Sequence, residues 1–147
     1  MDKLVADLGT AVAGHAIIDL VDYEAHPALV TQATVALQGL DIALICHGVL
    51  GDQIETEASF ASARPVLEVN LMSAISLLIP IANTLESQGS GNIAVITSVA
   101  ADRGRPKNFT YGAAKAGLNI YLEGLRSRLY HSGVKVHILR PGPVDTP

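Results

Sequence analysis

Tyr111 and Lys115 are the residues with the clearest chemical potential, and they lie four positions apart in the stretch FTYGAAKAGLN. Four residues is about one turn of an α-helix, so both side chains leave the same face and can act on one small ligand. A phenol can exchange a proton, and an ammonium group beside it favours the phenolate through its charge. The pair alone is weak evidence of function, because this spacing also arises by chance.

The elements that would position this pair can be predicted from hydrophobic patterns. Apolar or β-branched runs bounded by turn residues predict strands at His15–Leu20, Asp41–His47, Asn92–Ser98 and Val134–Arg140. Nearly continuous apolar strands are typical of a parallel sheet with helices on both faces. Helices are predicted at Tyr23–Gln38, at Glu57–Gln88 in two pieces with a break near Pro65, and at Phe109–His131. This alternation predicts an α/β fold with right-handed crossovers in one domain, 1–147.

Polar residues at the ends of these strands are the natural candidates for a site. Ligands of parallel α/β sheets bind beyond the carboxyl ends of the strands. The candidates there are Asp19, His47 with Gly48, Ser98, and the segment RPGPVDT after the last strand. Ser98 stands thirteen positions before Tyr111 and ends the strand that leads to its helix.

Composition narrows the classes of partner. The chain has a formal net charge of −4, and its ten Lys and Arg are scattered, which argues against nucleic acid or an anionic membrane. A small neutral or anionic metabolite fits better. The longest uncharged run, 69–85, contains several polar residues, so we expect a buried helix rather than a membrane span.

The cysteine and histidine content also bears on function. The single cysteine, Cys46, excludes a disulfide within the chain and favours a reducing compartment, so we expect a cytoplasmic protein with Cys46 buried on its strand. The five histidines show no metal-ligand spacing, and we expect no metal site.

Five motifs, in order, closely resemble the classical short-chain dehydrogenase/reductase family. They are ICHGVLG (the Asn-Ala-Gly turn), EVNLMSAISLL (the helix asparagine), VITSVAADRG (the serine strand), YGAAK (Tyr-x-x-x-Lys) and RPGPVDTP (the Pro-Gly turn). The resemblance implies a Rossmann-like, doubly wound parallel sheet. It also implies hydride transfer between NAD or NADP and a carbonyl or alcohol. The choice between NAD and NADP stays open.

Roles follow from this resemblance for four catalytic candidates. Tyr111 is expected to be the general acid or base, and Lys115 to favour its anion and bind the nicotinamide ribose. Ser98 is expected to hold the substrate oxygen by a hydrogen bond. Asn70 is expected to bend its helix and hold a water that links Lys115 to solvent.

The resemblance also assigns cofactor contacts. The residues are Asp19 and Leu20 at the adenine end, His47 and Gly48 along the ribose passage, Tyr111 and Lys115, and Pro141, Gly142, Val144 and Thr146 at the nicotinamide end. Cys46-His47 departs from the usual Asn-Ala, so His47 is expected either to tilt the turn or to contact the ribose.

The family domain is longer than this sequence, which lacks its first two strands, its glycine-rich loop and its last strand. We therefore expect a central portion of a longer protein that binds cofactor weakly by itself. The family strand order, 3-2-1-4-5-6-7, makes the strands that begin at Asp41, Asn92 and Val134 neighbours. It separates the His15 strand from them by two absent strands. Unpaired strand edges and exposed apolar surface predict a chain that aggregates by itself or depends on a partner protein for its stability.

Two alternatives remain open. The chain could be a catalytically incomplete fragment that acts as an oligomerisation or binding module, since family members form homodimers and homotetramers through the helices that match 58–85 and 109–130. The stretches HGVLGDQ and VAADRGRPKNFTYGAAKAGL also resemble the branch that reduces a decaprenylphosphoryl 2-keto sugar, which makes a keto sugar an alternative substrate. An epimerase or dehydratase is disfavoured, because Asn70 and the Pro-Gly turn are typical of the classical branch.

Overall fold

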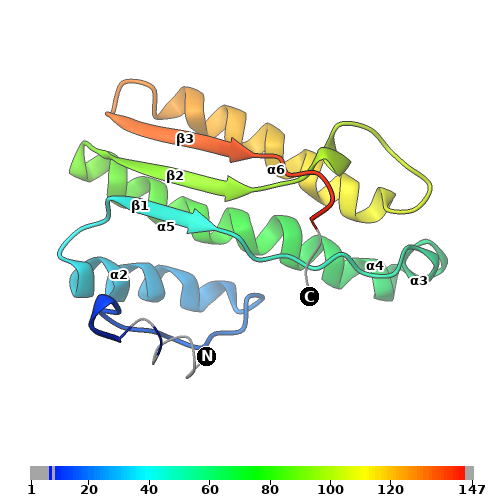
Figure 1. The fold of residues 1–147 in the computed structure, drawn as a ribbon, viewed down its shortest axis with the longest axis horizontal. Coiled ribbons are helices and arrows are strands. Elements are labelled where there is room, and N and C mark those ends of the chain that lie inside the picture. Colours follow the sequence, from blue (N-terminus) through cyan, green and yellow to red (C-terminus); the bar gives the residue numbers. More distant parts are fainter. Residues whose placement is uncertain (1–6, 8, 145–147) are drawn as a thin grey trace.

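A computed structural model describes residue 7 and residues 9–144. Three strands, β1 (Ile42–Ile45), β2 (Gly91–Ile96) and β3 (Val134–Leu139), form a parallel sheet in the order β1-β2-β3 (Figure 1). The register places Ile42 beside Asn92, and Gly91 beside Val134. The predicted neighbourhood of these three strands is therefore confirmed.

Helices connect the strands. The helices of eight or more residues are α2 (His26–Leu37), α4 (Phe60–Leu67), α5 (Ser73–Gln88) and α6 (Phe109–Arg128). Shorter elements are the 3-10 turns η1 (Gly9–Ala11), η2 (Tyr23–Ala25) and η4 (Val99–Ala101), the helix α3 (Gln53–Ala58), and the π-helix η3 (Glu68–Met72). The α/β class and the incomplete Rossmann-like sheet are as predicted.

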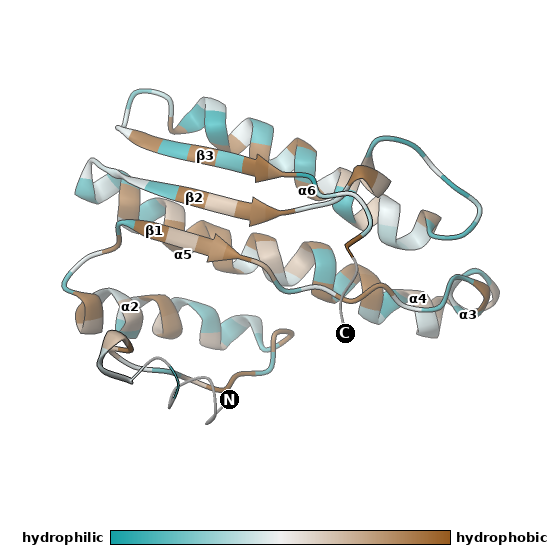
Figure 2. Cartoon of the chain, in the orientation of Figure 1, coloured by the Kyte–Doolittle hydropathy of each residue, from teal (hydrophilic) through white to brown (hydrophobic). Residues whose placement is uncertain are grey.

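The core lies between the sheet and the helices α5 and α6, which lie on one side of the strands (Figure 1). Ile93 and Val95 of β2 are fully buried there. On β1, by contrast, Ile42 and Leu44 are 67% and 56% exposed, and Figure 2 shows that strand as predominantly hydrophobic. Within the described residues, helices therefore cover one face of the sheet, not both as the strand pattern predicted.

The predicted strand at His15–Leu20 is wrong. In the structure this segment has no sheet pairing, and Ile17 is 80% exposed. A strand needs a hydrogen-bonded neighbour, and none of the three described strands lies beside this segment. Its apolar pattern is a local signal, whereas pairing depends on residues elsewhere.

The predicted break near Pro65 is also misplaced. The helical run is interrupted at Ser59, whose backbone is extended (φ −146°, ψ 126°), while Pro65 lies inside α4. The helix also begins earlier than predicted, because the Asp52 side chain accepts hydrogen bonds from the amides of Ile54 and Glu55 and caps α3. Burial of Val66 one residue beyond Pro65 helps offset the hydrogen bond that proline removes.

Two further observations concern single residues, the exposure of Cys46 and the end of α5 at Gly89. Cys46 is exposed rather than buried, because it follows the buried Ile45 and lies toward the uncovered side of the sheet. Gly89 ends α5 in the left-handed conformation (φ 75°), which glycine adopts readily at the end of a helix.

The helical run Phe60–Gln88 is long and apolar enough to cross a membrane by length and composition, with a mean hydropathy of 1.7. Such helices also occur in the cores of soluble proteins. Leu78, Ala82 and Leu85 of this run are fully buried against the rest of the chain, and we interpret it as a core helix.

Candidate active site

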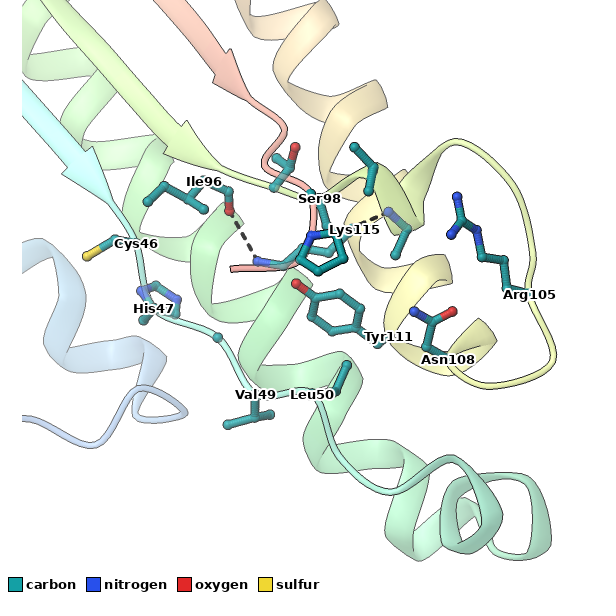
Figure 3. A pocket seen from close by; sticks show the side chains of 16 residues that line it. Cys46, His47, Val49, Leu50, Ile96, Ser98, Arg105, Asn108, Tyr111 and Lys115 are labelled. Atoms are coloured by element: carbon teal, nitrogen blue, oxygen red, sulfur yellow. Dashed lines mark hydrogen bonds between the residues drawn. The ribbon is translucent and has the colours of Figure 1, made fainter. Parts of the chain in front are cut away.

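A pocket of about 460 Å³ lies at the carboxyl ends of the three strands. Its walls come from the turn after β1, the end of β2, η4, the loop before α6, α6 itself and the turn after β3 (Figure 3). This is the edge of a parallel sheet where ligands are expected. Ser98, Tyr111 and Lys115 all line it.

Tyr111 and Lys115 lie side by side in this pocket, as their spacing on α6 predicts (Figure 3). The Lys115 Nζ lies 5.7 Å from the centre of the Tyr111 ring and donates a hydrogen bond to the carbonyl of Ile96 at 3.2 Å. Lys115 is only 3% exposed, and this burial lowers its pKa. A buried ammonium group thus stands beside the phenol.

Ser98 follows β2 and caps η4, where its Oγ accepts a hydrogen bond from the amide of Ala100 at 3.1 Å. A serine hydroxyl can accept and donate at once. The Ala100 bond uses an acceptor position, and the Ser98 hydroxyl donates to no group among the described residues, so its hydrogen can be donated to an oxygen in the pocket.

Asn70 lies in the π-helix, is 1% exposed and does not line the pocket. Its Nδ2 donates to the carbonyls of Val49 and Val66 at 2.7 and 2.8 Å, and its Oδ1 accepts from the amide of Val49 at 3.2 Å. The expectation that the helix is irregular at Asn70 agrees with the π-helix. The side chain fixes the turn that follows β1.

Gly48 stands in that turn and lines the pocket. A Cβ on Gly48 would lie 2.7 Å from the Oδ1 of Asn70 and 3.3 Å from the Nζ of Lys115. Only glycine allows the chain to pass so close to both groups.

Two contacts position the first turn of α6, which carries Tyr111. A Cβ on Gly112 would lie 2.8 Å from the carbonyl oxygen of Ala100, so this glycine lets α6 approach η4 closely. The Oε1 of Gln53 accepts a hydrogen bond from the amide of Thr110 at 3.1 Å, and its Nε2 donates to the Thr110 hydroxyl at 3.4 Å. These contacts hold the Tyr111 helix beside the Ser98 turn.

The remaining cofactor candidates do not all lie at the pocket. Asp19 and Leu20 do not line the pocket, and the Asp19 carboxylate accepts a hydrogen bond from the amide of Val21 in its own turn. Gly142 lines the pocket, whereas Pro141 accepts a hydrogen bond from the amide of Val99 through its carbonyl. Val144 is 68% exposed.

One cofactor candidate, Thr146, lies outside the described residues. His47 and Gly48 both line the pocket, and the His47 ring is bonded to Ser73 of α5.

Arg105 and Asn108 also line the pocket and were not identified from the sequence. The Oδ1 of Asn108 is buried and has no hydrogen-bond partner within the described residues. Asn108 immediately precedes the Tyr111 helix, and this cap position was the available signal. Across residues 7 and 9–144, no group of three or more His, Cys, Asp or Glu side chains could hold a metal ion.

A parallel, helix-connected sheet with serine, tyrosine and lysine around one pocket at its carboxyl edge defines a Rossmann-like α/β protein. The sequence matches the short chain dehydrogenase family over residues 1–147. The chain belongs to this family.

Relatives and solved structures agree with this assignment. The chain is 36% identical over 124 residues to an uncharacterised oxidoreductase of Mycobacterium tuberculosis, covering 84% of this chain and 50% of the relative. It is 35% identical over 129 residues to an uncharacterised oxidoreductase of Streptomyces coelicolor, covering 88% and 51%. A short-chain dehydrogenase structure from Streptomyces avermitilis has the same fold, with a TM-score of 0.89 at 23% identity, covering 99% of this chain and 53% of that one. The chain thus spans about half the length of the curated relatives it matches.

Proposed function

We propose that this chain carries the catalytic centre of an NAD(P)-dependent oxidoreductase that interconverts a carbonyl and an alcohol. The observation that carries the proposal is the convergence of Ser98, Tyr111 and Lys115 on one pocket at the carboxyl edge of the sheet. Family membership supports it, and the named relatives include an acetoacetyl-CoA reductase of Acinetobacter at 28% identity.

The proton chemistry is assigned to the side chains of the pocket. In reduction, Tyr111 donates its phenolic proton to the substrate oxygen, and in oxidation its anion removes that proton. The buried ammonium of Lys115 favours the phenolate by charge, an effect that low dielectric strengthens. The free hydroxyl hydrogen of Ser98 holds the substrate oxygen and stabilises charge that builds on it.

Asn70 supports this chemistry from outside the pocket. Both amide hydrogens of Asn70 are donated, to the carbonyls of Val49 and Val66, and its Oδ1 accepts from the amide of Val49. A water of the proposed relay to Lys115 would therefore bind at the backbone of the π-helix or at the second acceptor position of Oδ1. π-helical segments leave backbone groups unusually placed and occur frequently at functional sites.

The residues fit a nicotinamide nucleotide. When bound, the cofactor supplies or accepts the hydride. Gly48, Tyr111, Lys115 and Gly142 line a pocket with room for a nicotinamide nucleoside, and the unpartnered Oδ1 of Asn108 leaves an acceptor unused beside it. Solved structures of the same fold hold NAD⁺ in a xylitol dehydrogenase and NADP in ElxO. We propose no preference between the two, and Asp19, Leu20, Pro141, Val144 and Thr146 remain proposed contacts.

The loop before α6 brings positive charge to the pocket. Arg105 lines the pocket, and Arg103 and Lys107 lie in the same loop. None of these three forms a salt bridge within the described residues. In a chain with a net charge of −4, this local excess of positive charge favours a carbonyl substrate with a phosphate or carboxylate group. The phosphate-bearing keto sugar considered from the sequence is one such substrate.

Assembly and location are proposed with the function. Met72 and Ile79 on the η3–α5 run and Ile120 on α6 are 50%, 47% and 69% exposed, which supports a homodimer or homotetramer through these helices. A cytoplasmic location is consistent with the single cysteine.

Titration of NADH and NADPH fluorescence tests the cofactor assignment. It should be made on the polypeptide in which this chain occurs, with Lys115→Met as the test variant and Lys135→Met, on the exposed side of β3, as its control. We expect saturable binding that Lys115→Met weakens about tenfold or more and Lys135→Met leaves unchanged. Absence of binding by a folded sample would favour the binding-module alternative.

A further inference from the structure

His47 makes an inward contact that its place in the turn does not suggest. Its Nε2 lies 2.8 Å from the Oγ of Ser73, a fully buried serine at the start of α5. The same hydroxyl donates to the carbonyl of Val69 at 2.7 Å. A serine has one hydroxyl hydrogen, so with that hydrogen on Val69 the Oγ accepts from an Nε2–H of His47. His47 therefore carries a proton on Nε2, as both the neutral Nε2–H tautomer and the imidazolium do.

This contact and the Asn70 contacts hold the same turn from two directions. His47 is bonded to Ser73, and two residues later both the amide and the carbonyl of Val49 are bonded to Asn70. Asn70 lies in the π-helix and Ser73 directly follows it. Between the two anchors, Gly48 passes against the Nζ of Lys115. The position of the turn therefore limits where the ammonium group can lie.

The charges around His47 favour its neutral form. Burial is the main cause that lowers its pKa; the positive charge of Lys115 on α6, and that of His26 on α2 when it is protonated, act in the same direction. The backbone carbonyl of Val69 acts in the opposite direction by accepting a hydrogen bond. A protonated His47 would place a second buried cation near Lys115.

We propose that His47 is a positioning residue: as a neutral Nε2–H imidazole it ties the Gly48 turn to the π-helix through Ser73, and so fixes Lys115 beside Tyr111. The role of His47 in catalysis rests on the proposed function, but the hydrogen bond between His47 and Ser73 does not. The Nε2 of His47 is thus directed into the protein, and the ribose contact expected of His47 stays a prediction for the rest of its ring.

The chain contains a matched control for the hydrogen bond between His47 and Ser73. His26 of α2 is bonded through Nδ1 to the Oγ of Ser76 at 2.9 Å, less than one helical turn along α5 from Ser73. Both pairs join a histidine to a serine of the same helix, but neither His26 nor Ser76 lines the pocket. Ser73→Ala and Ser76→Ala are therefore equally small changes with different expected consequences.

The first test is nuclear magnetic resonance of the ¹⁵N-labelled polypeptide in which the chain occurs, which needs no activity. At pH 7 we expect His47 to be neutral with its proton on Nε2. Ser73→Ala should shift the amide resonances of Gly48 and Val49, and Ser76→Ala should leave them in place. A His47 that carries its proton on Nδ1 or is charged at pH 7 would overturn the proposal, as would equal effects of the two alanine variants.

The second test measures turnover across pH in the polypeptide in which the chain occurs. His47→Gln keeps an N–H donor near the Nε2 position, whereas His47→Leu removes it. We expect Leu to lower kcat about 10- to 100-fold with little change in the KM of the carbonyl substrate, and Gln to restore most of the loss. The activity of the wild type should fall at acidic pH as His47 becomes protonated. The His47→Gln variant should not show this fall. Equal activity of Leu and Gln variants would contradict the positioning role, whereas absence of turnover in the wild type would contradict the proposed function and leave the resonance test to decide the tie.

Discussion

At the scale of single residues, the site consists of groups whose burial costs stability. Lys115 is 3% exposed, and burial lowers its pKa, so the folded state holds the charged form less favourably than the unfolded chain does. This cost is fully present at pH values below the lowered pKa of Lys115, and it is relieved as pH rises from there toward the unfolded value. We expect Lys115→Met to raise the free energy of unfolding at pH 7 by about 1 kcal/mol while it removes activity. Urea unfolding at pH 7 checks this, and an unchanged or lower stability would count against a strained ammonium group.

A second prediction at the scale of residues concerns the stability of the fold at acidic pH. Burial is the main cause that lowers the pKa of His26 and of His47, so between their folded values and the ordinary value near 6.5 the unfolded chain binds protons that the folded chain does not. The free energy of unfolding should therefore fall as pH drops below about 6.5. Urea unfolding at pH 7.5 and 5.5 measures this fall, which His47→Gln should reduce. A pH-independent stability would show that neither histidine is buried in its neutral form.

At the scale of elements, two glycines of α6 provide an internal comparison. A Cβ on Gly112 would lie 2.8 Å from the carbonyl oxygen of Ala100, whereas a Cβ on Gly124 would meet nothing within 4 Å. We expect Gly112→Ala to lower the free energy of unfolding by about 1–3 kcal/mol, because α6 must move away from η4. Gly124→Ala should raise it by about 0.5–1 kcal/mol through helix propensity. Thermal unfolding of both variants measures the difference, and changes of the same sign would contradict the close packing of α6 on η4.

The elements also show what the sequence can predict. Strands β1, β2 and β3 and helix α6 could be predicted because their hydrophobic periods are local, and the Tyr111–Lys115 spacing then placed both side chains in one pocket. The His15–Leu20 segment could not, because strand formation needs a neighbour that no local pattern supplies. Likewise, the bond from His47 to Ser73 joins residues 26 positions apart, so only the folded chain reveals it.

At the scale of the whole molecule, the uncovered face of the sheet is the main feature. Leu44 of β1 is 56% exposed there, on an edge strand whose outer side has no partner among the described residues. We expect the 147-residue chain to self-associate at micromolar concentration, and Leu44→Thr to reduce this association because threonine keeps strand propensity but is polar. Ile54→Thr, at the 76% exposed Ile54 of α3, is the control and should have no effect. Sedimentation velocity measures both, and a monomeric wild type with a cooperative melt would refute the expectation.

The measurement that tests the central claim most directly is steady-state oxidation of NADH and NADPH with a panel of carbonyl substrates, by the polypeptide in which this chain occurs. Tyr111→Phe removes the hydroxyl in the pocket, and Tyr121→Phe removes one from the same helix outside the pocket. We predict that Tyr111→Phe lowers kcat at least about 100-fold while Tyr121→Phe retains wild-type activity. A Tyr111→Phe variant as active as the wild type would show that this tyrosine does not transfer the proton.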